Sequence, residues 1–216
     1  MKTLWTFGDS FTFGHGCRED CNSGLYEKYK SYKSDNDDIW PNKLSKLLQM
    51  HLKNLGVNGY CNNLIIDSII DNYDFIQEED CVVIGKSSSA RNHIPYNDNL
   101  YTILSPHELT KTNNKLLGHF DKFEPEIVET IINFQYYFSD NKFYKEQQDK
   151  RIQFLVNRLY SEKKVKKCIV WDLDIRKQFP TIIQETNGKI INYHFSWKGH
   201  SQFTKYLFSQ FNTNII

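Results

Sequence analysis

The chain has 216 residues, 39% of them hydrophobic, and its 27 Lys and Arg residues nearly balance its 26 Asp and Glu residues. A net charge of +1 offers no general attraction for nucleic acid or for an anionic membrane surface, so we expect neither as a partner. No apolar run approaches the roughly 18 residues that a membrane span requires. The length suits one domain with a sizeable core, which we expect to cover residues 1–216.

The first half of the chain alternates short apolar runs with helical patterns. A strand is predicted at Thr3–Phe7, and apolar residues spaced three and four apart predict a helix from Ile39 to Leu55 that stops at Gly56. The next expected elements are a strand at 57–66, a short helix at 68–76 and a buried strand at Cys81–Gly85.

The second half repeats this alternation after a long interruption. Residues 87–123 show no clear period and are predicted to form an irregular insertion. This insertion either shapes a substrate site or is an ordered excursion that packs its own Tyr96, Tyr101 and Leu104. Residues 124–160 have a helical pattern. The last expected elements are a strand at Lys167–Leu173, a weak strand at Ile182–Ile191 and a helix at Trp197–Phe211. Alternation of this kind predicts an α/β fold with a parallel sheet covered on both faces.

The cysteines fit free thiols in a reducing compartment, because there are five of them and several lie in or beside apolar segments. His15, Cys17 and Cys21 lie within seven residues of one another, but no fourth ligand is evident and the spacing matches no zinc pattern. We therefore expect neither a metal nor another cofactor.

A possible nucleophile follows the first strand. Gly8, Asp9 and Ser10 stand where that strand ends, and ligands bind at the carboxyl ends of parallel strands. Gly8 can let the chain turn sharply and present the Ser10 hydroxyl. The same tripeptide also fits a polar turn in which Asp9 or Ser10 caps backbone amides. A base is needed to distinguish the two interpretations, because a serine hydroxyl is a weak nucleophile on its own.

The best candidate for that base is His194, which lies just before the predicted last helix. The same junction contains Ser196, Gly199 and His200. A strand-to-helix junction there lies on the same edge of the sheet as Ser10, so the two side chains can meet.

These two segments, Gly-Asp-Ser near one end and His-Phe-Ser-Trp-Lys-Gly-His near the other, resemble the first and last blocks of the SGNH/GDSL hydrolases. The resemblance implies a three-layer α/β/α sandwich around a flavodoxin-like, five-stranded parallel sheet. It also implies hydrolysis of esters or acyl groups on small molecules, lipids or sugars without a cofactor, with Ser10 as nucleophile and His194 as base. The segment after Gly85 is similar to phage- or virus-like members, which suggests a cytoplasmic or virion-associated protein.

The catalytic acid departs from this family pattern. The family places it two or three residues before the histidine, where this chain has Asn192 and Ile191. An amide oxygen can orient an imidazole but stabilises its charged form less than a carboxylate does. Either Asn192 takes the role, or a backbone carbonyl or a carboxylate such as Asp172 or Asp174 replaces it.

The residues at the family's oxyanion-donor positions also depart from the family pattern. Asp67 or Ser68 falls where the family has a glycine, and we suspect that this alignment is displaced by a residue. No asparagine follows Gly85 at the expected place. The Ser10 amide with Ser87 or Asn63 can replace the usual donors, and Arg91 can bind an anionic substrate group. The candidate oxyanion and substrate-binding residues are therefore Asp9, Asn63, Ser87 and Arg91.

Two functions follow from these observations. The first is a serine esterase or acyl hydrolase that acts through Ser10 and His194 on a small acyl ester or an acetylated carbohydrate. The alternative is a catalytically degenerate binding module of the same fold, which keeps the pocket but has lost the acid and the oxyanion donors. The oligomeric state is left open by the sequence.

Overall fold

The computed structural model describes residues 1–14, 39–89, 91–96, 99–103, 124–138, 142–181, 185–186, 189–190 and 194–213. Its centre is a parallel sheet with the strand order β2-β1-β3-β6. The family resemblance implied five strands, and the described residues supply four. These strands are β1 (Thr3–Gly8), β2 (His51–Gly56), β3 (Cys81–Gly85) and β6 (Lys167–Trp171).

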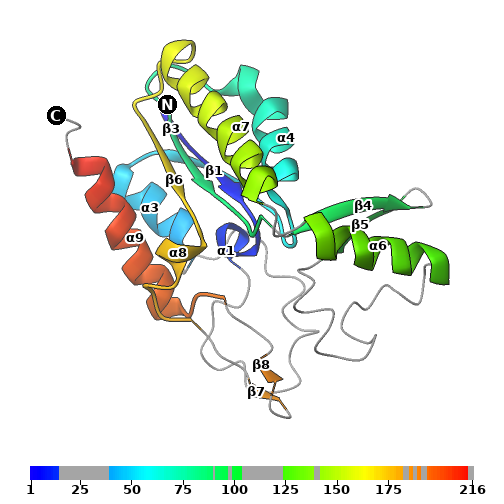
Figure 1. Ribbon diagram of the computed structural model, residues 1–216. Helices are drawn as coiled ribbons and strands as arrows, with labels where there is room; N and C mark the ends of the chain where they lie inside the picture. Colours follow the sequence, from blue (N-terminus) through cyan, green and yellow to red (C-terminus); the bar gives the residue numbers. More distant parts are fainter. Residues whose placement is uncertain are drawn as a thin grey trace.

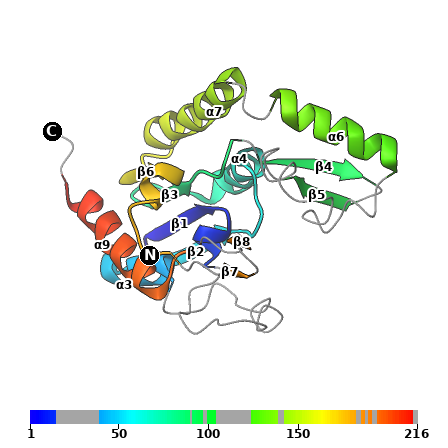
Figure 2. The same ribbon diagram turned by 60° about the horizontal axis from the view of Figure 1, so that its bottom comes forward.

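Helices cover both faces of this sheet (Figures 1 and 2). One face carries α3 (Trp40–Leu48) and α9 (Trp197–Asn212), and the other carries α4 (Asn62–Asn72) and α7 (Lys142–Ser161). The predicted α/β class, with a parallel sheet between two helical layers, is confirmed.

Strand residues supply the two cores in alternation, because successive side chains of a strand point to opposite faces. Trp5, Phe7 and Val82 pack among the residues of α4 and α7. Leu4 and Val83 pack on the other face, against α3 and α9. Because β1, β3 and β6 run parallel, their carboxyl ends lie at the same edge of the sheet.

The prediction for residues 39–66 was wrong in two places. The helix ends at Leu48 because Gln49 adopts a left-handed conformation with φ of 55°, and His51–Gly56 then pairs with β1 as a parallel strand. Leu52 and Leu55 continue the helical spacing, but strand pairing prevails over that periodicity. The strand expected at 57–66 is absent: residues 57–61 form a turn, and 62–66 begin α4, which buries Ile65, Ile66 and Ile69 on one face. A short 3-10 helix, Tyr73–Phe75, follows α4.

The insertion contains regular structure that the sequence pattern did not predict. β4 (Asn92–Tyr96) and β5 (Asn99–Ile103) form an antiparallel hairpin, and α6 (Pro125–Phe138) lies beside it (Figures 1 and 2). The helical pattern over 124–160 is confirmed as two helices, α6 and α7.

The strand predicted at Ile182–Ile191 does not join the main sheet in the described residues. A small antiparallel hairpin stands there instead, formed by β7 (Glu185–Thr186) and β8 (Lys189–Ile190). The strands β1, β3 and β6 and the helix α9 match their predicted positions closely.

Candidate active site

Ser10 is the first residue of α1 (Ser10–Phe13), a single helical turn that follows β1 directly. The side chain of Asp9 caps this turn by accepting a hydrogen bond from the Phe11 amide at 3.0 Å, and Gly14 ends it in a left-handed conformation. Ser10 is 6% exposed. The capping role expected of Asp9 as the alternative to catalysis is therefore present, and it fixes the backbone that presents the Ser10 hydroxyl.

Two glycines let α1 lie close to the ends of the strands. A Cβ atom on Gly8 would overlap the Thr12 hydroxyl, and one on Gly85 would stand 2.5 Å from Cζ2 of Trp171 and 2.9 Å from Oγ1 of Thr12. Any larger residue would force the turn or the indole to move. The positions of Gly8 and Gly85 thus set the height of Ser10 above the sheet.

His194 meets Ser10 from the opposite end of the chain. Its Nε2 lies 2.6 Å from Oγ of Ser10, across a sequence separation of 184 residues. The Phe11 ring packs on the imidazole with centroids 4.8 Å apart, and buried Phe195 follows His194. In the tautomer with its proton on Nδ1, Nε2 accepts the hydrogen bond from the serine hydroxyl, which is the arrangement that a general base needs.

Ser196 holds the adjacent helix in place. Its Oγ caps α9 by accepting a hydrogen bond from the Gly199 amide at 3.0 Å. His200 is completely buried, and its Nδ1 accepts a hydrogen bond from the Trp40 amide at 3.2 Å. His200 therefore ties α9 to α3 and has no contact with Ser10 in this arrangement.

Arg91 lies beside the nucleophile and has a protein partner. Its Nη1 donates to Oδ2 of Asp9 at 3.1 Å and to the Tyr60 carbonyl at 3.2 Å. Burial raises the pKa of the Asp9 carboxyl, while the Arg91 charge and the Phe11 amide oppose that shift. The sequence placed Arg91 near the site but gave no sign of its link to Asp9.

The two predicted oxyanion candidates, Ser87 and Asn63, are placed differently. The Ser87 amide donates to Oδ1 of Asn62 at 2.8 Å. The buried Ser87 hydroxyl lies near Asp9 and slightly lowers its pKa, although it makes no hydrogen bond of regular geometry. Asn63 turns toward α7, where its amide contacts Tyr144 at 3.2 Å and Arg151 at 2.9 Å.

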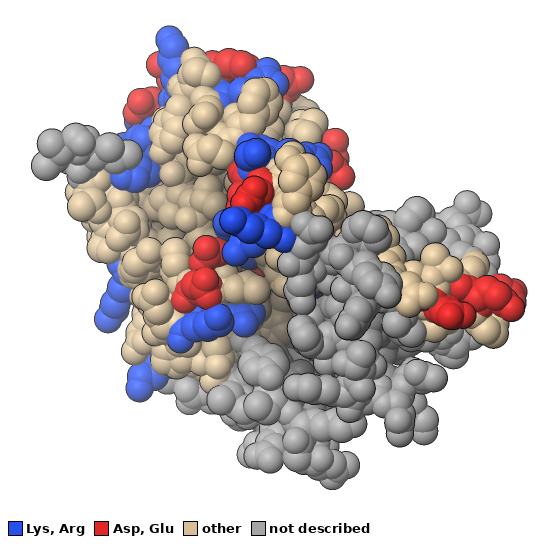
Figure 3. All heavy atoms as spheres, in the orientation of Figure 1, with Lys and Arg blue, Asp and Glu red and all other residues tan. Residues whose placement is uncertain are grey.

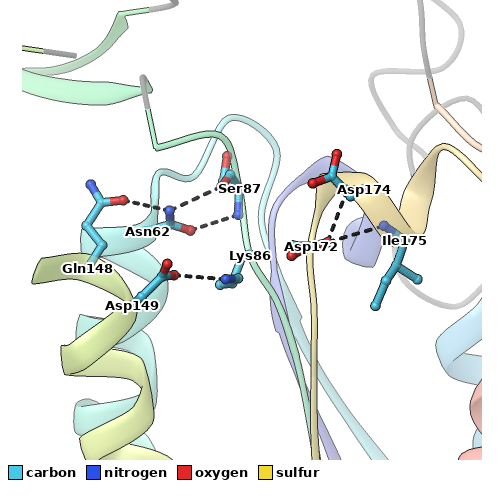
Figure 4. A network of polar contacts seen from close by, with 8 residues as sticks. All are labelled: Asn62, Lys86, Ser87, Gln148, Asp149, Asp172, Asp174 and Ile175. Atoms are coloured by element: carbon cyan, nitrogen blue, oxygen red, sulfur yellow. Dashed lines mark hydrogen bonds and ion pairs between the residues drawn. The ribbon is translucent and has the colours of Figure 1, made fainter. Parts of the chain in front are cut away.

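Asn62, which the sequence analysis did not single out as a site residue, is the asparagine that faces the end of β3 (Figure 4). Its Nδ2 donates to the Ser87 carbonyl at 3.1 Å and to Oε1 of Gln148 at 2.8 Å. Asp67 is an exposed residue of α4, and the displaced alignment with the family glycine stays a prediction. Asn62 could have been considered from the sequence, because it is adjacent to the candidate Asn63 and is the same type of residue.

The carboxylates considered as partners for His194 have other roles in the structure. Asp172 caps the short helix α8 (Leu173–Arg176) by accepting from the amides of Asp174 and Ile175 (Figure 4). Asp174 pairs with Lys177 at 2.8 Å. Asn192 lies outside the described residues, so its orienting role stays a prediction.

A polar hollow of about 210 Å³ lies beside Ser87, between the ends of α7 and α8. The contact of Lys86 with Asp149 at 2.8 Å (Figure 4) forms one wall. Lys177, Asp174 and Ser88 also line the hollow. Figure 3 shows side chains of both charge signs intermingled over this part of the surface. Such a lining suits a ligand rich in hydroxyl groups.

No three His, Cys, Asp or Glu side chains group as a metal site within the described ranges. His15, Cys17 and Cys21 lie outside those ranges. Among the helices that the structure describes, none is long and apolar enough to cross a membrane.

Solved structures that resemble the whole chain are lipolytic proteins and esterases. One from Desulfitobacterium hafniense DCB-2, assigned to the G-D-S-L family of lipolytic proteins, is 13% identical, covers 97% of this chain and 99% of its own, and has a TM-score of 0.40. Phospholipase A1 from Streptomyces albidoflavus NA297 is 8% identical, with 96% and 98% covered and a TM-score of 0.40. A catalytic mutant of an acetylxylan esterase from Geobacillus stearothermophilus is 11% identical, with 99% and 95% covered and a TM-score of 0.37.

A scan against protein-family models found no match, and neither did a search of curated proteins.

Proposed function

We propose that the protein is a serine ester hydrolase in which Ser10 is the nucleophile and His194 the general base. The observation that carries this proposal is the 2.6 Å contact between Nε2 of His194 and Oγ of Ser10. A buried serine that opens a helix and faces an imidazole is the geometry that nucleophilic catalysis needs.

In the first half of the reaction, Oγ of Ser10 attacks the ester carbonyl while Nε2 of His194 takes the hydroxyl proton. The tetrahedral intermediate then collapses, and His194 returns that proton to the departing alcohol. Water attacks the acyl-Ser10 ester in the second half, again giving its proton to His194, and the carboxylic acid leaves as Ser10 recovers its hydroxyl.

The Ser10 backbone N–H is the oxyanion donor that we propose. The Ser87 N–H donates to Oδ1 of Asn62, and Nδ2 of Asn62 donates to the Ser87 carbonyl. Neither group offers a donor to an oxyanion unless these hydrogen bonds open. Removal of one such donor costs about 10² to 10³ in turnover in related chemistry. We therefore expect a slow esterase.

Substrates that fit the surroundings of Ser10 are small acyl esters of hydroxyl-rich alcohols, acetylated carbohydrates included. The polar hollow beside Ser87 can receive the hydroxyl groups of such an alcohol, since Lys86, Asp174 and Ser88 supply both donors and acceptors.

The alternative is a binding module that keeps the pocket without turnover. The mutual bonding of Asn62 and Ser87 favours it, because these groups are then committed to structure rather than to an oxyanion.

A fluorophosphonate probe and a 4-nitrophenyl acetate assay test the proposal. Ser10→Ala should abolish both labelling and turnover, and His194→Ala should reduce turnover to near background. Ser209→Ala, a change at an exposed serine on α9, is the matched control and should retain both. Turnover that survives Ser10→Ala would sink the assignment, and a wild-type protein without labelling or turnover on an ester panel would favour the binding module.

A further inference from the structure

A second cavity lies beyond the end of β3, and its lining shares no residue with the polar hollow. It has a volume of about 600 Å³ and is bounded by the start of α4, by β4, by α6 and by the start of α7. This volume falls within the range of small-molecule sites, roughly 300 to 1,000 Å³. Figures 1 and 2 show α6 lying alongside β4, beyond the sheet.

Much of the lining of this cavity is apolar. Leu64, Ile127, Ile131 and Phe134 contribute hydrocarbon surface, and Phe134 is 44% exposed. No Lys, Arg, Asp or Glu residue is among the described lining residues.

Four polar side chains of the lining bond to protein groups: Asn63, Asn92, Thr130 and Tyr144. Tyr144 accepts a hydrogen bond from Nδ2 of Asn63 at 3.2 Å and donates to Oδ1 of Asn92 at 2.8 Å. Thr130 donates to a carbonyl of its own helix at 2.8 Å. Burial lowers the pKa of His93 to about 4, so this side chain is uncharged at neutral pH.

Arg91 connects this cavity to the nucleophile. Its guanidinium contacts Asp9, the residue before Ser10, and the Tyr60 carbonyl. The cavity wall begins one residue beyond each of these contacts, at Asn92 and Cys61, and consecutive Cα atoms are only about 3.8 Å apart. The near wall of the cavity therefore adjoins, in the chain, the residues that hold the Arg91 contact with Asp9.

We propose that this cavity, lined by α4, β4 and α6, is the acyl-chain site of the hydrolase and that it favours esters of medium-length fatty acids over acetates. The inference rests on the proposed function and refines it. The apolar cavity takes the acyl chain, while the separate polar hollow beside Ser87 takes the alcohol. Each buried methylene then adds about fourfold to kcat/KM until the cavity is filled.

The test compares kcat/KM for 4-nitrophenyl acetate, butyrate and octanoate. In the wild-type protein the octanoate ester should exceed the acetate by about tenfold or more. Leu64→Trp should remove that preference by filling the cavity and leave the acetate rate within about twofold, since a hydrophobic site discriminates by its free volume. Thr130→Trp fills the cavity from an exposed position and serves if Leu64→Trp fails to fold.

Glu129→Trp is the matched control, because Glu129 is an exposed α6 residue that does not line the cavity. It should keep the wild-type preference. Acetate turnover without a preference for octanoate would overturn the acyl-chain site and leave the proposed hydrolase standing, as would equal effects of Thr130→Trp and Glu129→Trp.

Binding without turnover separates this inference from the hydrolase itself. Octanamide should bind Ser10→Ala in a calorimetric titration and should bind much more weakly when Leu64→Trp or Thr130→Trp is added. Absence of octanamide binding would overturn the cavity assignment. Absence of labelling and turnover with every ester would instead overturn the proposed function.

Discussion

Nη1 of Arg91 lies 3.1 Å from Oδ2 of Asp9, and Asp9 is only 2% exposed. This ion pair joins the segment after β3 to the residue that precedes the nucleophile. A second bond from the same nitrogen to the Tyr60 carbonyl adds the loop after β2. One guanidinium group therefore fixes three strand ends around Ser10.

Removing only one partner of this pair should be costly. Arg91→Met keeps part of the aliphatic stem but leaves the Asp9 carboxylate buried without its counter-charge, which typically costs about 3–5 kcal/mol of unfolding free energy. The double variant Asp9→Asn with Arg91→Met should recover much of that loss, because no uncompensated charge remains. Urea unfolding of the four proteins in the cycle measures the coupling.

Lys2→Met is the control for this cycle, since Lys2 and Glu79 form an exposed pair at 3.0 Å. Its cost should stay below about 1 kcal/mol. A loss for Arg91→Met as small as that of Lys2→Met, with no recovery in the double variant, would show that the buried pair does not hold the site together.

Gly85→Ala should damage the site more than the fold. The new Cβ atom would stand 2.5 Å from Trp171 and 2.9 Å from Thr12, so α1 and the Ser10 hydroxyl must shift. We expect the rate of fluorophosphonate labelling per folded molecule to fall by about 10², because displacements near 1 Å can cost that much.

Ile69→Val supplies the comparison for Gly85→Ala. Ile69 is fully buried on α4, and its truncation should lower the unfolding free energy by about 0.5–1.5 kcal/mol without slowing the labelling. Similar labelling rates for both variants would mean that the Gly85 contact does not position Ser10.

Local sequence patterns predicted an element correctly where the apolar periodicity and the tertiary packing agree. β3 is a continuous apolar run buried on both faces, and its bounds were predicted correctly. Ser10 and His194 were brought to one sheet edge by the rule that parallel strands end together, and the structure places them in contact.

Long-range contacts decided the places where the prediction failed. Leu52 fits a helical period, but its strand pairs with Leu4 of β1, which no local pattern records. Arg91 and Asp9 are 82 positions apart, so the sequence could place each near the site without pairing them. Asn62 and Asn63 are the same type of residue, and only their positions on α4 determine that Asn62 faces Ser87.

The group that orients His194 can be identified by removing candidate oxygens one at a time. Asp172→Asn preserves the cap of α8, because Asn and Asp cap helices about equally well. Asp174→Asn breaks an exposed pair with Lys177 and keeps a polar side chain of the same size in the hollow. Both should leave turnover within about twofold, as expected for weak surface interactions.

Asn192→Ala should instead lower kcat by about tenfold or more, as expected for a residue that fixes the imidazole tautomer. Steady-state kinetics with 4-nitrophenyl acetate measures all three variants. A fall of about 10² or more for Asp172→Asn, with little effect of Asn192→Ala, would assign the orienting role to the carboxylate after β6.

Stability should decline in acid partly through His200. Burial lowers the pKa of this side chain to about 3, whereas an unfolded histidine has a pKa near 6.5. Below about pH 6.5 the unfolded chain binds a proton that the native state does not, so each unit of further acidification costs about 1.4 kcal/mol until the folded pKa is approached. The stabilisation from uncharged, buried His200 is therefore fully present above about pH 6.5 and is lost as the pH falls toward the folded pKa.

His200→Asn isolates this contribution, because Oδ1 of asparagine can take the place of Nδ1 and accept from the Trp40 amide. The variant should be less stable at pH 7.5, since it loses buried ring volume. Between pH 7.5 and 5, however, it should lose about 2 kcal/mol less unfolding free energy than the wild-type protein, by the same linkage. The control His51→Asn changes an exposed histidine and should reproduce the wild-type slope. Parallel slopes for His200→Asn and the wild-type protein in urea unfolding would show that protonation of His200 does not limit acid stability.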